Sequence, residues 1–486
     1  GLGTGAVDSI TTGDYNVGVG DGALTANTTG NYNTADGYQA LFYNTAGAYN
    51  TANGYRALYY NTIGNYNTAD GYQALYYNTT GADNTASGYQ ALFYNTTASF
   101  NTALGRSALY YNTTGANNTA NGYRALNSNT TGSNNTANGY EALLSNTTGN
   151  NNTASGYQAL YANTTGSSNT ASGYEALKSG QSYTAGTFTV GVTFVIAVVG
   201  TTDFTLIGAS ANTVGISFVS TGLGTGTGTA TSRNTGGSNV AIGRSALAGV
   251  TTGRLNTAVG YDALGDNTTG NYNTAVGNYA SNSNTTGLSN TSVGGKSLDS
   301  NTSGNANVAI GYEAGAKNTT AGYNVAIGYR SAYYGTTGEY NTSVGYKSLQ
   351  GKPLVNSVTG GGNTAIGAYA LDTNDIGINN TAVGNGALGA YDANNSVQGY
   401  NTCIGYGSGR SIITGHGNVI LGSFDGNEDG LDISDIDNNI VLSDGDGTWR
   451  LHIDSTTITG VGAFTSTSID ATKLSGALPA ISGANL

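Results

Sequence analysis

An acidic segment near the C-terminal end is the first candidate for chemistry. Asp425-Gly-Asn427-Glu-Asp429-Gly places carboxylate and amide oxygens at alternate positions, as in the first half of a calcium-binding loop. The twelfth position, where such a loop supplies a bidentate glutamate, holds Ile436. Two hypotheses remain: Asp425, Asn427 and Asp429 bind calcium, or the segment is a solvated acidic loop. The missing glutamate favours the acidic loop.

Other residues with catalytic or metal-binding chemistry are scarce. The two histidines, His416 and His452, lack a cysteine partner and metal-ligand spacing. Cys403 stands where its repeat usually has alanine, which predicts a small buried side chain. The sequence has no nucleophile elbow or P-loop, and the glycines of Gly224–Gly228 lie in a Gly/Thr tract with no following helix. We therefore expect no catalytic residues, no cofactor and no enzymatic activity. The remaining enzymatic alternative is a glycan depolymerase with paired carboxylates between chains.

The 36 tyrosines support two interpretations. Exposed aromatic ladders can stack on sugar rings, whereas buried ones pack between coils or between chains. One such column lies two residues after a repeated leucine: Tyr43, Tyr60, Tyr77, Tyr94 and Tyr111. We favour packing and keep glycan binding as the alternative.

A 17-residue repeat must position all of these residues. Ten glycines from Gly20 to Gly173 are each 17 apart, in the frame Asn-Thr-Ala-x-Gly-Tyr-x-Ala-Leu-x-Tyr-Asn-Thr-Thr-Gly-x-x. The frame returns at Gly243 and continues to Gly422. Within this second array, two of the steps between key glycines lengthen to 22 and 21 residues. A period this short and regular indicates a solenoid.

Each coil is too short for a pair of helices, and it is rich in the poor helix formers Gly, Asn and Thr. We expect two short strands joined by two tight turns. One strand is centred on segments such as Asn239–Gly243, and a turn lies at Asn78–Gly81. Stacking in register gives a parallel ladder of roughly 4.8 Å per coil. The predicted fold is an all-β parallel β-solenoid or β-roll.

In-register stacking predicts columns of identical residues. The repeated Ala-Leu pair predicts the core, and the column of Asn44, Asn61 and Asn78 predicts an amide ladder that bonds the turn backbone. Many of these asparagines lie in Asn-x-Thr glycosylation motifs, but the motifs follow from the repeat, so we favour the structural role. The residue before the key glycine is Val or Ile in most of the second array and polar in most of the first. This difference predicts a dry column in the second array and a wet one in the first.

The frame divides the chain into six segments. They are a lead-in (1–15), a first solenoid array (16–180), an inserted β-rich module (181–236), a second array (237–424), an acidic capping segment (425–460) and a linker to a further C-terminal region (461–486). Within the cap, we expect a non-repeat strand at Ile440–Ser443, followed by Trp449. The only prolines, Pro353 and Pro479, lie outside repeat cores.

Charge and hydropathy exclude several partners. A net charge of −12 with 9% charged residues provides no basic stripe for nucleic acid. The longest apolar candidate, Val190–Val199, is about half the length that spans a bilayer, so we expect no membrane insertion. With no methionine and no signal peptide, we expect a processed or partial chain. The thin Ala/Leu core predicts that other copies cover apolar surface, and three-fold association does so economically.

Two families resemble these repeats. Asn239–Ala246 and Asn324–Ala332 resemble the head repeats of trimeric autotransporter adhesins, a left-handed parallel β-roll, although those heads have a shorter period. The Asn-Thr-Ala-x-Gly-x-x-Ala-Leu arrays are similar to repetitive bacteriophage tail-fibre proteins, as are Tyr183–Ala230 and Asn438–Arg450. This resemblance, which covers most of the chain, implies a homotrimeric, extracellular virion tail fibre. Its partners would be a host cell-surface glycan or other receptor and other virion tail proteins. The alternative is a bacterial surface adhesin or extracellular filament subunit.

Overall fold

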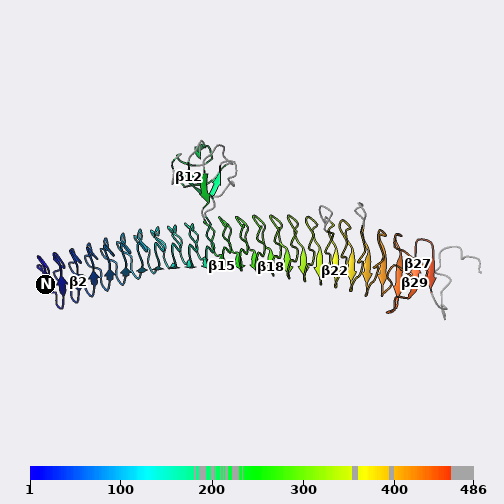
Figure 1. Ribbon diagram of the computed structural model, residues 1–486, viewed down its shortest axis with the longest axis horizontal. Helices are drawn as coiled ribbons and strands as arrows, with labels where there is room; N and C mark the ends of the chain where they lie inside the picture. The colour runs from blue at the N-terminus through cyan, green and yellow to red at the C-terminus, as the bar shows by residue number, and fades with distance from the viewer. Residues whose placement is uncertain are drawn as a thin grey trace, which may run out of the picture.

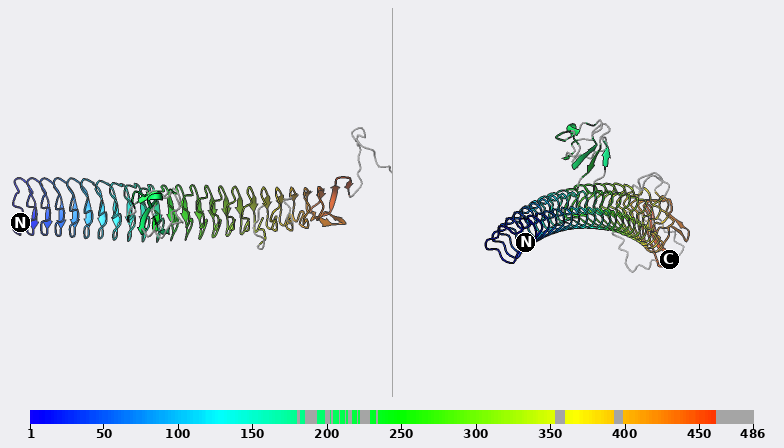
Figure 2. Two further views of the ribbon diagram at one scale, coloured as in Figure 1. Left: turned by 90° about the horizontal axis from the view of Figure 1, so that it is seen from above. Right: turned by 60° about the vertical axis from the view of Figure 1, so that its left-hand side comes forward.

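The protein is a long, gently curved rod (Figures 1 and 2). The computed structural model describes residues 1–179, 182–184, 193–198, 202, 204–207, 209–211, 213, 217–219, 221, 229–232, 234–352, 360–392 and 399–460. The rod is a parallel β-solenoid of about 22 coils with 17-residue repeats, so the predicted fold class is confirmed. At roughly 4.8 Å per coil, its length is on the order of 100 Å.

The first array contributes ten strands of three residues each, every one paired in parallel with the next. Thr51 aligns with Thr68 and Ala52 with Ala69, so equivalent residues lie above one another. The strands are β1 (Val17–Val19), β2 (Thr34–Asp36), β3 (Thr51–Asn53), β4 (Thr68–Asp70), β5 (Thr85–Ser87), β6 (Thr102–Leu104), β7 (Thr119–Asn121), β8 (Thr136–Asn138), β9 (Thr153–Ser155) and β10 (Thr170–Ser172).

The second array continues the same ladder. β10 pairs directly with β15, with Thr170 opposite Val240, so the two arrays form one solenoid. Its strands are β15 (Val240–Ile242), β16 (Thr257–Val259), β17 (Thr274–Val276), β18 (Thr291–Val293), β19 (Val308–Ile310), β20 (Val325–Ile327), β21 (Thr342–Val344), β22 (Thr364–Ile366), β23 (Thr381–Val383), β24 (Thr402–Ile404) and β25 (Val419–Leu421).

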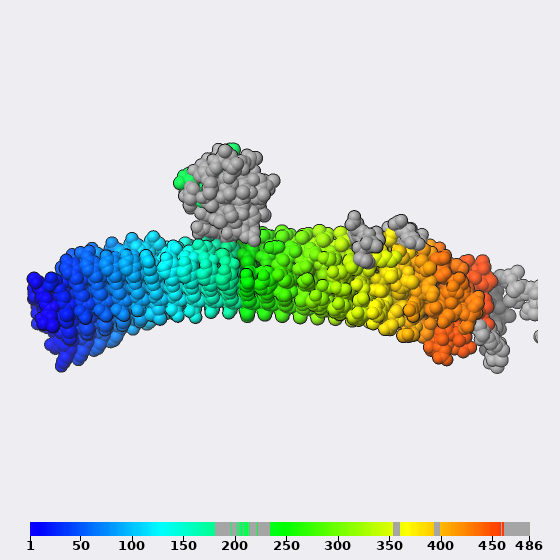
Figure 3. Space-filling view, viewed as in Figure 1, coloured from blue at the N-terminus to red at the C-terminus, as the bar shows by residue number. Residues whose placement is uncertain are grey.

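Between β10 and β15 the chain leaves the ladder and forms a separate antiparallel sheet, which stands beside the rod in Figure 1, and the space-filling view of Figure 3 shows the rod itself as one continuous, curved body. The strand order is β11-β14-β12-β13. The elements are β11 (Ser182–Thr184), β12 (Thr193–Val198), the 3-10 helix η1 (Phe204–Ile207), β13 (Ser217–Val219) and β14 (Thr229–Ser232). Phe204 and Ile207 of η1 are buried.

The C-terminal end reverses the direction of the sheet. A short hairpin, β26 (Asn427–Glu428) and β27 (Leu431–Asp432), precedes β28 (Ile440–Ser443). The strand predicted at Ile440–Ser443 is thus present, but it is not separate from the repeat: β28 pairs in parallel and in register with β25 and is the last parallel strand. The antiparallel strands β29 (Trp449–Ile453) and β30 (Ile458–Gly460) then follow. Trp449 of β29 packs against the core.

Some sequence predictions fall outside the described residues. These are the linker at 461–486, the Gly224–Gly228 tract and both prolines.

Each described coil has one strand, not the two predicted from its length. On the other side of the coil, alternate residues adopt the left-handed conformation, with φ of 55° at Gln39 and 51° at Leu41, which excludes an extended strand. The Gln39 N–H donates to the preceding coil (Asp21 carbonyl, 2.8 Å), and the Leu41 N–H donates to the following coil (Ala57 carbonyl, 3.0 Å). Hydrogen bonds between coils therefore replace a second sheet.

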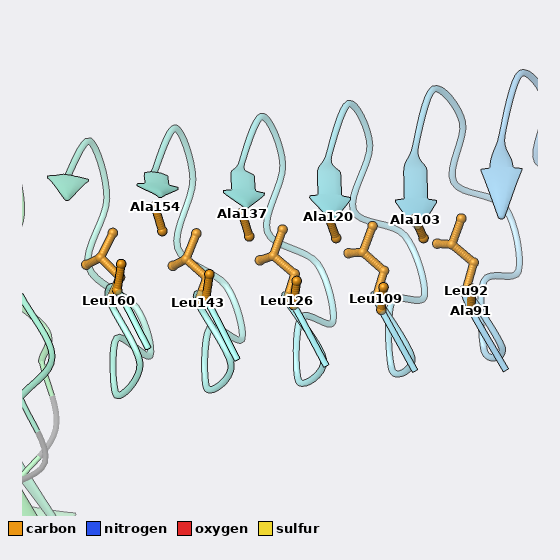
Figure 4. Close-up of a cluster of buried hydrophobic side chains, with 14 of the residues drawn as sticks. Ala91, Leu92, Ala103, Leu109, Ala120, Leu126, Ala137, Leu143, Ala154 and Leu160 are labelled. Carbon is orange, nitrogen blue, oxygen red and sulfur yellow. The ribbon is translucent and has the colours of Figure 1, made fainter. Parts of the chain in front are cut away.

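The core is a set of straight columns inside a single chain (Figure 4). The strand alanines, such as Ala103 and Ala120, face the leucines of the opposite side, such as Leu109 and Leu126, and all of these side chains are fully buried. The predicted Ala and Leu core columns are thus confirmed. In the first array no other chain is needed to cover them.

Two asparagine columns close the coils of the first array. In the predicted column, Asn44 donates to Asn27 Oδ1 (2.8 Å) and to the Gly47 carbonyl (2.9 Å). A second column, which the sequence analysis did not separate from the strand, contains Asn33, and its amide donates to the same Gly47 carbonyl at 2.8 Å. Asn33 Oδ1 in turn accepts the backbone N–H of Asn50 at 3.0 Å. Each coil is therefore bonded to its neighbour by buried amides as well as by strand pairs.

Candidate binding surfaces

The acidic segment is tied to the solenoid by Asp425. One oxygen of Asp425 accepts the backbone N–H of Asn427 at 2.7 Å, and the other accepts the Ser411 hydroxyl at 3.0 Å. Asn427 starts β26, and Asp429 lies in the hairpin turn. Burial, together with the neighbouring carboxylates of Asp425 and Asp429, raises the pKa of Glu428. Within the described residues no group of three or more His, Cys, Asp or Glu side chains could hold a metal ion. The geometry favours the hypothesis of an acidic structural loop.

The histidines and the cysteine occupy separate structural positions. His416 Nδ1 lies 2.7 Å from Asp437 Oδ1, whereas His452 is buried with Nε2 2.8 Å from Asn439 Oδ1. Cys403 takes the place of a core alanine and is fully buried, as predicted, and this burial raises the pKa of its thiol. The structure does not bring these three residues together with the acidic loop into one site.

The tyrosines form stacked ladders along the rod. In the column that begins Tyr38, Tyr55 and Tyr72, ring centroids are 5.3 and 5.0 Å apart with nearly parallel planes. Each ring inside such a stack has both faces covered by its neighbours. The faces that would stack on a sugar are therefore occupied, which supports packing between coils as the role of these ladders.

A double ladder of aromatic residues occupies one side of the first array. Tyr59, Tyr76 and Phe93 stack on one another and are 8% exposed, because the predicted column containing Tyr60 and Tyr77 lies edge-on over them. Burial and a hydrogen bond with Tyr43 raise the pKa of Tyr59 to about 12. The Tyr43 column is thus an outer layer of the coil, while alanine and leucine fill the interior.

The outward strand face differs between the two arrays. Ile242 and Ile310, which precede the key glycines of their coils, are 44% and 40% exposed in the single chain. The prediction of a dry column in the second array is therefore wrong for one chain, because strand alternation turns this position away from the core. The equivalent residues of the first array, such as Asp36 and Asn53, are exposed as predicted. The second array and β28 thus carry a column of exposed or half-buried aliphatic residues, referred to here as the aliphatic column: Ile242, Val259, Val276, Val293, Ile310, Ile327, Val344, Ile366, Val383, Ile404, Leu421 and Leu442.

A groove of about 900 Å³ crosses the turn side of the rod near its C-terminal end. Its floor is a coil with three small residues, Gly386, Gly389 and Ala390, at positions where the first array carries large side chains such as Gln39, Phe42 and Tyr43. A Cβ atom added to Gly386 would meet nothing within 4 Å. The coils on either side form the walls. The sequence analysis missed this groove, although three small residues in one coil of the repeated frame are a visible signal.

Comparisons with known proteins assign no family to the chain. No protein-family model matches the chain, and no curated protein sequence matches it. Across the described part of the chain, no helix has the length and apolar character required to cross a membrane.

Proposed function

We propose that the protein is a structural and adhesive fibre: a stiff spacer of a bacteriophage tail fibre that presents a contact surface to a host cell. The observation that carries this proposal is the unbroken parallel ladder from β1 to β28, which passes the inserted module without a gap in register. Every coil contacts only its neighbours, so length follows directly from repeat number. The proposal includes no enzymatic role and an extracellular location on the virion.

Assembly into a homotrimer is the second part of the proposal, and the aliphatic column supports it. A row of Val, Ile and Leu side chains at regular spacing on a flat sheet face is a surface that another copy of the same rod matches in period. The core columns do not support association, because a single chain already buries them completely. Trimerisation through the second array would give three copies of each weak receptor contact and hence avidity.

A bacterial surface adhesin or extracellular filament subunit is the alternative. The aliphatic column supports it as well, because a filament subunit would bury the same residues against other copies.

Light scattering of the purified chain tests the assembly. We expect about three times the 48.9 kDa chain mass. The double variant Ile310→Lys/Ile327→Lys should shift the mass toward one chain while the circular dichroism spectrum is kept. The matched control Asn121→Lys/Asn138→Lys changes the same strand face in the first array and should leave the mass unchanged. A wild-type chain that is a folded monomer would reject the trimer.

Adsorption to cells tests the adhesive role. Labelled wild-type protein should bind a subset of a panel of Gram-negative and Gram-positive species, and electron microscopy should show straight or gently curved rods. Failure to adsorb to any species in a panel broad enough to include the host would remove adhesion from the proposal and leave a spacer alone.

A further inference from the structure

We propose that the groove over Gly386, Gly389 and Ala390 binds a neutral oligosaccharide. The inference rests on the proposed adhesive function and assigns the receptor contact to one place on the rod. It differs from the sequence-based idea that the repeated tyrosine ladders stack on sugars.

The groove offers aromatic surface that the ladders lack. Tyr406, in one wall, is 70% exposed and has no ring partner among the described residues, whereas ladder tyrosines such as Tyr55 have a ring on each side. Tyr369, in the other wall, contacts Tyr346 at 5.3 Å, but the next residue of its column is Gly386. Among the described residues, no ring therefore covers Tyr369 on the side of the next coil, and its side chain is 41% exposed. The apolar C–H face of a pyranose ring packs on such uncovered aromatic surface.

Polar groups surround this aromatic surface. Asp372 Oδ1 is buried and accepts no hydrogen bond from the described residues, an arrangement that is costly unless a ligand donates to it. Burial raises the pKa of Asp372, with Lys347 acting in the opposite direction. Arg410 and Asn385 also line the groove and are exposed. Sugar hydroxyls both donate and accept, so they can satisfy a carboxylate, a guanidinium and an amide together.

The same residues disfavour other ligand classes. A phosphate or other polyanion would meet the carboxylate of Asp372 as well as the single arginine in the lining, Arg410. A divalent cation would meet that guanidinium, and the described residues hold no cluster of metal ligands here. The volume of about 900 Å³ is within the range of small-molecule sites, and the mixed polar and apolar lining suits a sugar, which has both hydroxyl groups and apolar C–H faces.

The test begins with the full chain on an array of oligosaccharides that contain hexoses, deoxyhexoses, N-acetylhexosamines or uronates. The oligosaccharide retained best is then titrated by calorimetry. We expect a neutral one to bind, and we expect Tyr406→Ala to weaken it at least tenfold.

A filled groove gives the second variant. Gly386→Gln/Gly407→Gln installs the residue found at the equivalent positions Gln39 and Gln73, which adopt φ of 55° and 53°, close to the 68° and 62° of the two glycines. A Cβ atom at either glycine meets nothing within 4 Å, so the coils should fold normally while the groove loses binding. The matched control is Tyr157→Ala, which removes a tyrosine at the same coil position as Tyr406 but inside a stacked ladder. It should bind as the wild type does.

Each remaining outcome counts against the groove. The proposed sugar site would be overturned if no oligosaccharide bound, or if only uronate-containing ones bound. Equal binding by the wild type, the groove variants and the control would also overturn it. The cell panel separates this inference from the proposed function. If the groove variants adsorb to cells as well as the wild type does, the groove is not the receptor contact and the proposed adhesive function stands. If the groove binds sugar but no cell is bound, the groove stands and adhesion fails.

Discussion

Replacing one ladder asparagine with alanine should weaken the bonding between neighbouring coils, and the loss of local stability can be worked out from Asn67. Its amide donates to Asn50 Oδ1 (3.1 Å) and to the Gly81 carbonyl (2.8 Å). Its Oδ1 accepts the backbone N–H (3.1 Å) and the side-chain amide (3.1 Å) of Asn84. All four bonds disappear in Asn67→Ala.

The groups left behind differ in their consequences. The Gly81 carbonyl keeps the Asn78 amide, and the Asn84 amide keeps the Ala98 carbonyl. The backbone N–H of Asn84 loses its acceptor while Asn84 stays buried, which costs about 1–3 kcal/mol. With about 0.5–1 kcal/mol for each of the other three bonds, the expected loss is about 2.5–6 kcal/mol.

Native-state hydrogen exchange is the suitable assay, because long repeat arrays do not unfold in two states. The backbone amides of Thr68 and Thr85, which bond to the following coils at 2.8 Å, report on the site. Their protection should fall by roughly two to four orders of magnitude. The control Asn53→Ala removes an exposed asparagine from the neighbouring strand and should change protection by no more than about twofold. Equal effects of the two variants would refute the argument that the ladder stabilises the rod.

A charged replacement adds a pH dependence of known sign. Asn67→Asp keeps the acceptor for Asn84 but places a carboxylate beside the Gly81 carbonyl and Asn50 Oδ1, so burial should raise its pKa above the unfolded value of about 3.9. The folded state then binds the proton more tightly than the unfolded state. Stability should fall as pH rises from about 4 and level off above the folded pKa. The stability difference between Asn67→Ala and wild type should not change over this interval, and a flat profile for Asn67→Asp would contradict a buried carboxylate.

Three further predictions concern the frame, the glycine column and the module. Deleting the whole coil 68–84 should leave a shorter rod with nearly unchanged melting, whereas deleting Thr68 alone shifts the following strand residues to the opposite face and should prevent soluble expression; equal behaviour would exclude in-register stacking. Gly71→Ala places a Cβ atom 2.6 Å from the Gly88 carbonyl oxygen at a φ of 139°, so it should cost about 3 kcal/mol or more in exchange protection. Gly386→Ala, which meets no atom within 4 Å, should cost about 1–2 kcal/mol. Deleting residues 182–232 should leave the rod's melting unchanged, because β10 pairs with β15 without them; loss of the rod would show that the module joins the arrays.

The repeat predicted the fold because coils of equal length stack in the same register. Once Ala52 stacks on Ala69, the same register must hold at every coil of equal length, and the Ala, Leu and Asn44 columns follow. What the repeat did not predict was the conformation within a coil. Left-handed residues at Gln39 and Leu41 replace the expected second strand. The left-handed conformation is uncommon for residues other than glycine, so the identity of these residues does not indicate it.

Sequence therefore determined the columns, the ladder and the position of the inserted module. It did not predict that the aliphatic column is turned away from the core. Alternation along a three-residue strand makes Ala309 and Ile310 point in opposite directions, but only the closed coil shows that the buried alanine column leaves isoleucine on the outside. The candidate binding groove belongs wholly to the tertiary structure. Tyr369, Gly386 and Tyr406 lie in three successive coils, and they meet only because stacking brings residues about 20 positions apart to within a few ångströms.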